Sequence, residues 1–159
     1  MKIILGIDPG FGRMGFGCVC VEKHGVRALD FGVMTTTNTG IFEDRLLHLA
    51  HDLNELISTL KPDLIVVEKL FFGKSVTTAM KVSEVRGVVR LLAAQARVPV
   101  LEIGPAQVKK AITGSGTATK QGMQKMVAQL LGLPRIPRPD DAADALALAL
   151  TASTMHKFY

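Results

Sequence analysis

The sequence has few of the features that mark membrane or secreted proteins. It contains two cysteines, no tryptophan, and no apolar run near the ~18 residues that a membrane-spanning helix needs. The N-terminal run Met1–Leu5 is short and is soon followed by Gly6 and Asp8, which predicts a first strand and not a signal peptide. We therefore expect a cytoplasmic protein without membrane contact. Its 159 residues are enough for a single domain over residues 1–159.

The two cysteines, Cys18 and Cys20, are poorly placed to bond each other. On an extended segment they would share one face, and no histidine pair lies nearby to complete a zinc site. We expect buried free thiols in a reducing cytosol.

Acidic residues are scarce in the middle of the chain. From Lys69 to Arg138 there are twelve lysines and arginines and only two acids, Glu84 and Glu102, a balance of +10. The rest of the chain carries seven bases and twelve acids, a balance of −5, and the two parts give the overall +5. Such a basic segment forms a solvated face or binds a polyanion. The acids on either side of it favour a polyanion.

Hydrophobic periodicity predicts an α/β fold. Strands are expected at residues 2–8, 15–22, 26–34, 64–68 and 98–103, and helices at 43–60, 76–96, 105–112, 119–131 and 140–155. Brief connections make the first three strands antiparallel neighbours, and two helical crossovers add parallel strands to them. The prediction is a mixed five-stranded sheet flanked by helices. The apolar stripe of helix 76–96 fits both a core position and a two-fold interface.

A glycine-rich turn follows the first strand. Residues 10–15 match G-x-G-x-x-G, and Asp30 lies twenty residues beyond Gly10, as in a dinucleotide-binding loop. That loop must open a helix, whereas residues 15–22 have the composition of a strand. We interpret the glycines as a tight turn between strands that leaves Asp8 at the exposed end of the first strand. Capping of the turn by its own carboxylate is the alternative role for Asp8.

Acids recur at other element ends. Glu68 closes the fourth apolar run, and parallel pairing with the first strand would bring it to the same sheet edge as Asp8. In the last helix, Asp141 and Asp144 are three residues apart and share a face, with Asp140 as an alternative partner of Asp144. An N-cap role for Asp140 and a first-turn charge for Asp141 also fit this pattern.

Carboxylates gathered at one edge repel each other unless cations lie between them. Hard oxygen ligands suit Mg²⁺ or Mn²⁺, and two such ions can activate a water and stabilise the leaving oxygen of a phosphodiester. Because the acids bracket the basic segment, the sequence predicts a divalent-metal-dependent endonuclease with two ions per active site.

Four motifs then occur in a fixed order. They are Gly6-Ile7-Asp8-Pro9-Gly10 with Gly15 and Gly17, Val67-Glu68-Lys69-Leu70-Phe71, Gly104-Pro105-Ala106-Gln107-Val108-Lys109, and Asp141-Ala142-Ala143-Asp144-Ala145-Leu146-Ala147. Together they resemble the bacterial RuvC family of Holliday-junction resolvases, members of the ribonuclease H-like superfamily. The resemblance covers essentially the whole chain.

The resemblance implies cleavage of four-way DNA junctions by symmetric paired nicks, in recombination and repair. Lys109 and Lys120 match basic residues that the family places near the scissile phosphate, although a solvated lysine is the alternative for each. A mobile lysine after the Gly-Ser-Gly loop is suited to stabilise charge on a pentavalent phosphate. The family pattern favours Asp141 over Asp140 and assigns the metal to four acids: Asp8, Glu68, Asp141 and Asp144.

The resemblance also implies DNA contacts and partners. Phe71 matches the family aromatic that wedges among bases at the junction centre, which unstacks DNA. Phe72 follows it, so one of the two rings can be the wedge and the other can pack in the core. Further DNA contacts are expected from basic residues of the middle segment, at Lys74, Lys81, Lys109, Lys110 and Lys120. A homodimer is implied, as is a branch-migration machinery of the RuvA and RuvB type.

Three other classes fit parts of the pattern. One is another nuclease on the same fold, such as a ribonuclease H or a ribosomal-RNA-processing relative; the Pro9 turn, Phe71 and the Asp141/Asp144 spacing favour the resolvase. A sugar-kinase or Hsp70-like ATPase begins with a similar turn but needs two domains to enclose ATP. A non-catalytic junction-binding module would have lost an acid, and none is replaced here.

Overall fold

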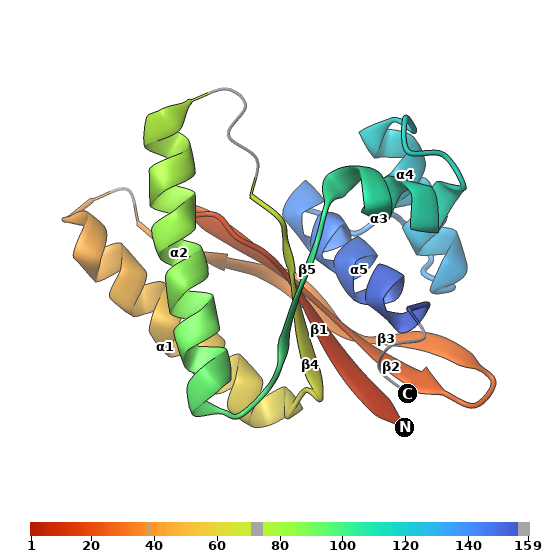
Figure 1. The fold of residues 1–159 in the computed structure, drawn as a ribbon, viewed down its shortest axis with the longest axis horizontal. Coiled ribbons are helices and arrows are strands. Elements are labelled where there is room, and N and C mark those ends of the chain that lie inside the picture. Colours follow the sequence, from red (N-terminus) through yellow and green to blue (C-terminus); the bar gives the residue numbers. More distant parts are fainter. Residues whose placement is uncertain (38, 71–74, 156–159) are drawn as a thin grey trace.

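The computed structural model describes residues 1–37, 39–70 and 75–155, which form a five-stranded sheet with helices on both faces (Figure 1). The strands are β1 (Lys2–Asp8), β2 (Arg13–Glu22), β3 (Gly25–Thr35), β4 (Leu64–Glu68) and β5 (Val100–Ile103). The helices are α1 (Phe42–Leu60), α2 (Val76–Gln95), α3 (Pro105–Thr113), α4 (Lys120–Leu130) and α5 (Asp140–Ser153). Phe71, Phe72 and Lys74, for which DNA contacts are predicted, lie outside the described residues.

The strand order is β3-β2-β1-β4-β5. β2 pairs antiparallel with both β1 and β3, because only a tight turn separates each pair. β4 pairs parallel with β1, and β5 pairs parallel with β4, after the crossovers through α1 and α2. The predicted mixed α/β sheet is confirmed. β1 lies at its centre, which places the end of β1 in the middle of one sheet edge.

Two apolar layers hold the helices against the sheet. Side chains alternate along β1, so Ile4 packs in the layer under α3, α4 and α5, and Leu5 packs in the layer under α1 and α2. Both side chains are buried. α1 and α2 therefore cover one face and α3, α4 and α5 cover the other, as Figure 1 shows. Within the described ranges, no helix is both long and apolar enough to span a membrane.

α5 lies directly on the backbone of β1 and β2. A Cβ atom on Gly6 would stand 2.0 Å from the carbonyl oxygen of Ala145, and one on Gly15 would stand 2.1 Å from that of Asp141. Real Cβ atoms do not approach so closely, so only glycine permits this contact. Because Gly15 pairs with Asp8 across the strands, the contact sets the first turn of α5 above the end of β1.

The glycine-rich turn leads into β2, so the interpretation as a strand-to-strand turn is confirmed and no dinucleotide-type helix follows it. Cys18 and Cys20 are buried free thiols, as predicted. Burial, together with nearby Asp30, raises the pKa of the Cys18 thiol to about 12, which keeps it protonated and unreactive.

Several predicted boundaries are off by one or two residues; the second strand, for example, begins at Arg13 and not at Gly15. The fifth strand begins at Val100, not at Val98, because the Val98 amide donates to the Ala93 carbonyl and so completes the end of α2. The last helix ends at Ser153. Its N-cap is Pro139, so Asp140 is not the cap but the first helical residue.

Candidate active site

Two acids lie side by side at the carboxyl ends of neighbouring strands. Ile7 of β1 pairs with Val67 of β4 in parallel register, so the next residues, Asp8 and Glu68, emerge at the same edge. Glu68 follows four buried residues in β4 and is itself only partly buried. The sequence predicted this neighbourhood from the apolar runs that each acid closes.

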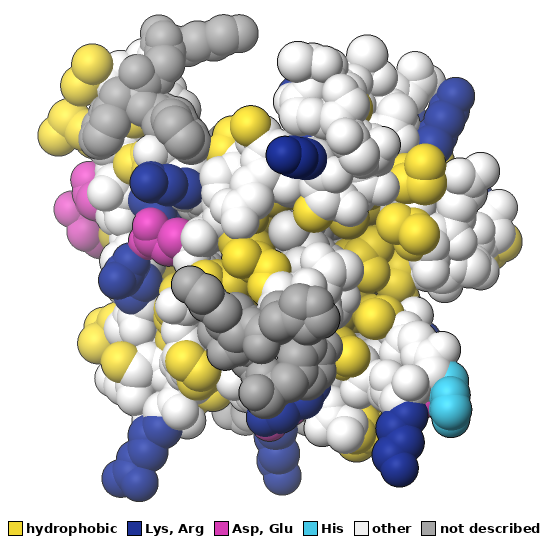
Figure 2. Space-filling model, turned by 45° about the vertical axis from the view of Figure 1, so that its right-hand side comes forward, with side chains coloured by type: hydrophobic (Ala, Val, Ile, Leu, Met, Phe, Trp, Pro, Cys, Tyr) yellow, Lys and Arg dark blue, Asp and Glu magenta, His cyan; other side chains and the backbone are white. Residues whose placement is uncertain are grey.

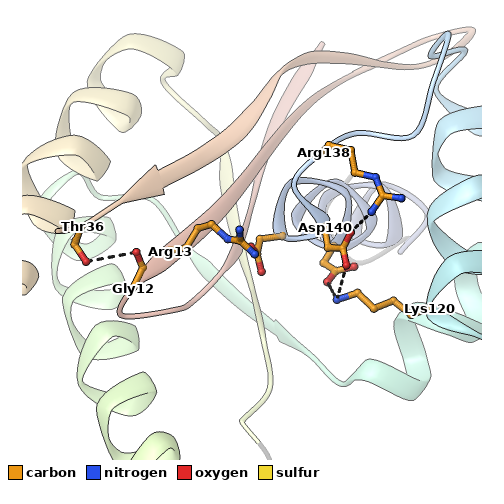
Figure 3. A network of polar contacts seen from close by, with 8 residues as sticks. Gly12, Arg13, Thr36, Lys120, Arg138 and Asp140 are labelled. Atoms are coloured by element: carbon orange, nitrogen blue, oxygen red, sulfur yellow. Dashed lines mark hydrogen bonds and ion pairs between the residues drawn. The ribbon is translucent and has the colours of Figure 1, made fainter. Parts of the chain in front are cut away.

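α5 adds two more acids over the same edge. Asp141 and Asp144 line one cavity of about 350 Å³ with Asp8 and Glu68. Asp140 is not among the residues that line it. It forms ion pairs with Lys120 and Arg138 instead (Figure 3). The rest of the lining comes from α3, α4 and α5 and mixes apolar with basic side chains: Pro105, Val108, Lys109, Lys120, Met123 and Leu148.

Burial and crowding favour the neutral form of Asp8. Desolvation raises its pKa to about 7, and the carboxylates of Asp144, Glu68 and Asp141 act in the same direction, while Lys120 opposes them. The pKa of Glu68 is also raised, first by desolvation and then by Asp144. The cavity therefore holds more negative charge than its surroundings neutralise.

Cationic side chains partly compensate this charge. The Lys120 Nζ lies 2.8 Å from Oδ2 of Asp144 and 3.9 Å from Oδ2 of Asp140. The hydrogen bond to Asp144 raises the pKa of Lys120. Lys109 lines the cavity and lowers the pKa of Glu68. Both lysines singled out from the sequence thus face the acids.

Three residues around the acids were not predicted. Arg13, at the start of β2, forms an ion pair with Asp141, and in Figure 3 its side chain points toward the start of α5. Gln124 is 3% exposed and donates from Nε2 to Oδ1 of Asp144 over 3.1 Å. Arg86 of α2 lowers the pKa of Glu68. A usable signal existed for Gln124, because it lies four residues after Lys120 on the same face of α4.

Among the described residues, two further predicted DNA contacts, Lys81 and Lys110, do not line this cavity. Lys110 of α3 is exposed and does not line it. Lys81 of α2 lies over the ring of Phe11, with Nζ 5.3 Å from the ring centroid. Basic side chains project from several parts of the face seen in Figure 2, and acidic ones show mainly at its left.

The acids fit a divalent cation by their chemistry. All four offer hard carboxylate oxygens, and Oδ2 of Asp141 is buried without a hydrogen-bond partner although Arg13 forms an ion pair with it. No three acidic, histidine or cysteine side chains of the described segments already stand close enough to hold a metal ion. Lys120 and Arg13 instead bind two of these carboxylates. A bound cation would neutralise these carboxylates in place of Lys120 and Arg13.

Fold and site together define a nuclease with a ribonuclease H-like sheet. A model of the family described as "Crossover junction endodeoxyribonuclease RuvC" matches residues 4–152. A protein of that description from Chloroflexus aurantiacus is 49% identical over 158 residues, which cover 97% of this chain and 96% of the relative.

Solved structures agree with this match. The Thermus thermophilus RuvC structure has a TM-score of 0.88 and 38% identity, over 99% of this chain and 94% of that chain. A second structure, T. thermophilus RuvC in complex with Holliday junction substrate, has a TM-score of 0.86 and 35% identity over the same shares. The chain belongs to the RuvC family of crossover junction endodeoxyribonucleases. Membership implies a nuclease that depends on a divalent metal and hydrolyses phosphodiester bonds.

Proposed function

We propose that this chain cuts four-way DNA junctions, with Asp8, Glu68, Asp141 and Asp144 as the ligands of two Mg²⁺ ions. The observation that carries the proposal is the convergence of these acids from β1, β4 and α5 on one cavity. The T. thermophilus relative is described with a Holliday junction substrate, which supports the same substrate here. Mn²⁺ offers the same coordination chemistry.

The bound ions would supply an activated water and stabilise the leaving oxygen of the phosphodiester. The chain's own residues prepare the site. Asp8 must release its proton to act as a ligand, and its pKa of about 7 means that a neutral or mildly basic solution favours this. Gln124 holds one oxygen of Asp144 and so orients the carboxylate.

Lys120 is proposed to stabilise the charge that develops on the phosphate. It is 55% exposed and opens α4 directly after the loop that contains Gly114 and Gly116, so it can leave Asp144 for a phosphate oxygen. Lys109 lines the same cavity from α3, and among the described residues it has no ion-pair partner. Two such cations beside the scissile phosphate would stabilise the charge of the transition state more than that of the ground state.

A homodimer is proposed to deliver the two symmetric nicks. The stripe on α2 divides into two faces: Ala79, Val85, Val89 and Ala93 are buried core. Val76, Met80 and Leu91 are 70%, 58% and 58% exposed, at a spacing that places them on one side of the helix. Gly87 lies on that side with open space around it, so a second helix can approach closely. An isologous contact of this kind gives two-fold symmetry.

Further proposals follow from the family and the fold. We expect residues 1–159 to act as one nuclease domain, since both apolar layers share one sheet. Phe71 or Phe72 is expected to be the wedge, with Lys74, Lys81 and Lys110 on the DNA backbone. A RuvA- and RuvB-type machinery is the expected partner, in the cytoplasm.

The decisive experiment compares a synthetic four-way junction, a linear duplex and an RNA–DNA hybrid, each with and without Mg²⁺. We expect cleavage of the junction alone, and only with the metal. Asp8→Asn should abolish cleavage and retain junction binding in a gel-shift assay. Wild-type cleavage by Asp8→Asn would refute the proposed site, and equal cleavage of all three substrates would refute the proposed specificity.

A further inference from the structure

Two cationic side chains from different helices lie over one aromatic ring outside the cavity. The guanidinium carbon of Arg45 (α1) is 5.2 Å from the centroid of the Phe11 ring, and Nζ of Lys81 (α2) is 5.3 Å from it. Nζ of Lys81 is also 5.7 Å from the ring of Phe42, which meets Phe11 edge-on at 6.1 Å. These four residues are here called the Phe11 cluster.

The Phe11 cluster carries positive charge that no neighbouring acid neutralises. Across the described part of the chain, neither Arg45 nor Lys81 has a carboxylate within ion-pair distance. Asp44 lines a hollow beside Arg45 without pairing with it. Two like charges on one ring repel each other, and the faces of the two rings offset this only in part. Anionic groups bound to the two cations would relieve the repulsion.

Arg45 is already oriented for such an anion. Its Nε donates to Oγ1 of Thr36 over 3.1 Å, and Oγ1 of Thr36 donates to the Phe11 carbonyl over 2.9 Å. Among the described residues, neither of its two terminal NH₂ groups has a hydrogen-bond acceptor. A guanidinium held in this way presents a planar pair of donors, which matches the oxygens of a phosphate.

The Phe11 cluster lies at the same end of the sheet as the four acids, on the face that α1 and α2 cover. Phe11 lies in the turn between β1, which ends at Asp8, and β2, which begins at Arg13. In Figure 3, Gly12 of this turn hydrogen-bonds Thr36 on one side, and the neighbouring Arg13 points toward the first turn of α5 on the other. The same turn connects the two places, so DNA that extends from the cavity across this end of the sheet would meet the cluster.

We propose that Arg45 and Lys81, held on the Phe11 and Phe42 rings, each contact a phosphate of the DNA backbone and so form a second backbone-binding site at the end of the sheet where the acids lie. The inference rests on the proposed function for the identity of the DNA, a four-way junction. The site takes a phosphodiester and does not read bases, because guanidinium and ammonium groups on the sugar-phosphate backbone carry no sequence information. Its contribution is affinity and orientation, which are sensitive to salt.

The test measures junction affinity against KCl concentration in an Asp8→Asn background, so that the DNA stays uncut. Fluorescence anisotropy of a labelled four-way junction gives the slope of log affinity against log salt. Each lost phosphate contact should lower the magnitude of this slope by about 0.9, so Arg45→Gln/Lys81→Gln should lower it by about 1.8. Arg45→Lys keeps the charge and loses the planar donors, so the slope should stay and the affinity should fall.

The matched control is Lys2→Gln/Lys23→Gln, which removes two exposed charges at the opposite end of the sheet, roughly 30 Å away along β2. Its slope should equal that of the parent. An unchanged slope in the Arg45/Lys81 double variant, or an equal fall in the control, would overturn the proposal. Arg45 and Lys81 would then only pack over the aromatic rings. If the double variant does not fold, Lys81→Gln alone must lower the slope by about 0.9.

The outcome is separable from that of the proposed function. If the chain with native Asp8 fails to cut junctions while the slopes differ as expected, the phosphate site stands and the junction specificity falls. If the chain cuts junctions but the Arg45/Lys81 double variant has the same slope as its parent, the proposed function is supported and the phosphate site is refuted.

Discussion

Burial of Asp8 and the three carboxylates near it all raise the pKa of this acid. The acid closes a buried strand, and its pKa of about 7 lies well above the model-peptide value of 3.8. Its ionised form is unfavourable in the protein alone and becomes favourable once a cation arrives. Under the proposed function, the same features that destabilise the metal-free site would create its affinity for metal.

Asp8 makes the metal-free protein less stable as the pH rises. The folded pKa is about 7 and the unfolded one 3.8, so between these values the folded state binds a proton that the unfolded state has lost. The contribution of Asp8 to stability thus falls from about pH 4 upward and levels off above about pH 7. From pH 6 to pH 8 the free energy of unfolding should drop by about 1 kcal/mol, measured by urea denaturation in EDTA. The Asp8→Asn variant should lack this component; an identical drop in that variant would contradict the assignment.

Lys120 is expected to act on the rate of cleavage. Lys120→Met removes the cation that faces Asp144, so the single-turnover cleavage rate should fall by roughly 10²–10³-fold with Mg²⁺ saturating. Lys125 is exposed on the same helix, which makes Lys125→Met the control, and its rate should stay near wild type. A comparable loss in both variants would point to general weakening of DNA binding.

At the scale of elements, the position of α5 determines whether the four acids come together in one cavity. Its alanines let it lie on the glycines of β1 and β2, and that contact carries Asp141 and Asp144 to the strand acids. Larger side chains at the interface would lift the helix and separate the two pairs of carboxylates.

Gly17→Ala tests this close contact. The new Cβ would lie 2.5 Å from the backbone nitrogen of Leu146, so the free energy of unfolding should fall by roughly 1–3 kcal/mol or more, measured by urea denaturation. Gly116→Ala is the control, because its Cβ would meet only an ordinary contact at 3.5 Å from the Ala106 carbonyl. Equal stability of the two variants would show that α5 can shift freely.

At the scale of the whole molecule, one chain presents one cavity of acids, and two symmetric nicks require two. The exposed apolar side of α2 is the feature that can join two copies. The distance between the two cavities would then be set by helix packing and not by DNA.

Leu91→Glu should convert the dimer into a monomer. A charge in the centre of an apolar helix contact is costly to desolvate, so light scattering after size exclusion should give half the wild-type mass. Paired nicking of a junction should become uncoupled. Leu130 of α4 is 52% exposed and supplies the control, Leu130→Glu, which should remain dimeric. A monomeric wild type would contradict the interface.

The sequence by itself determined the strand and helix order and the gathering of Asp8 with Glu68. These follow from local periodicity and from the parallel pairing that a helical crossover imposes, so they need no knowledge of side-chain packing. Periodicity left Asp140 and Asp141 open, and the family pattern favoured Asp141. The tertiary structure brings Asp141 and not Asp140 into the cavity, since both lie in the first turn of α5 and the Gly15 contact sets which one faces Asp8. The partners Arg13 and Gln124, and the cations on the Phe11 ring, likewise arise from contacts between distant segments. Such contacts depend on how closely α5 and the first turn approach the sheet. The hydrophobic periodicity of the sequence does not determine that distance.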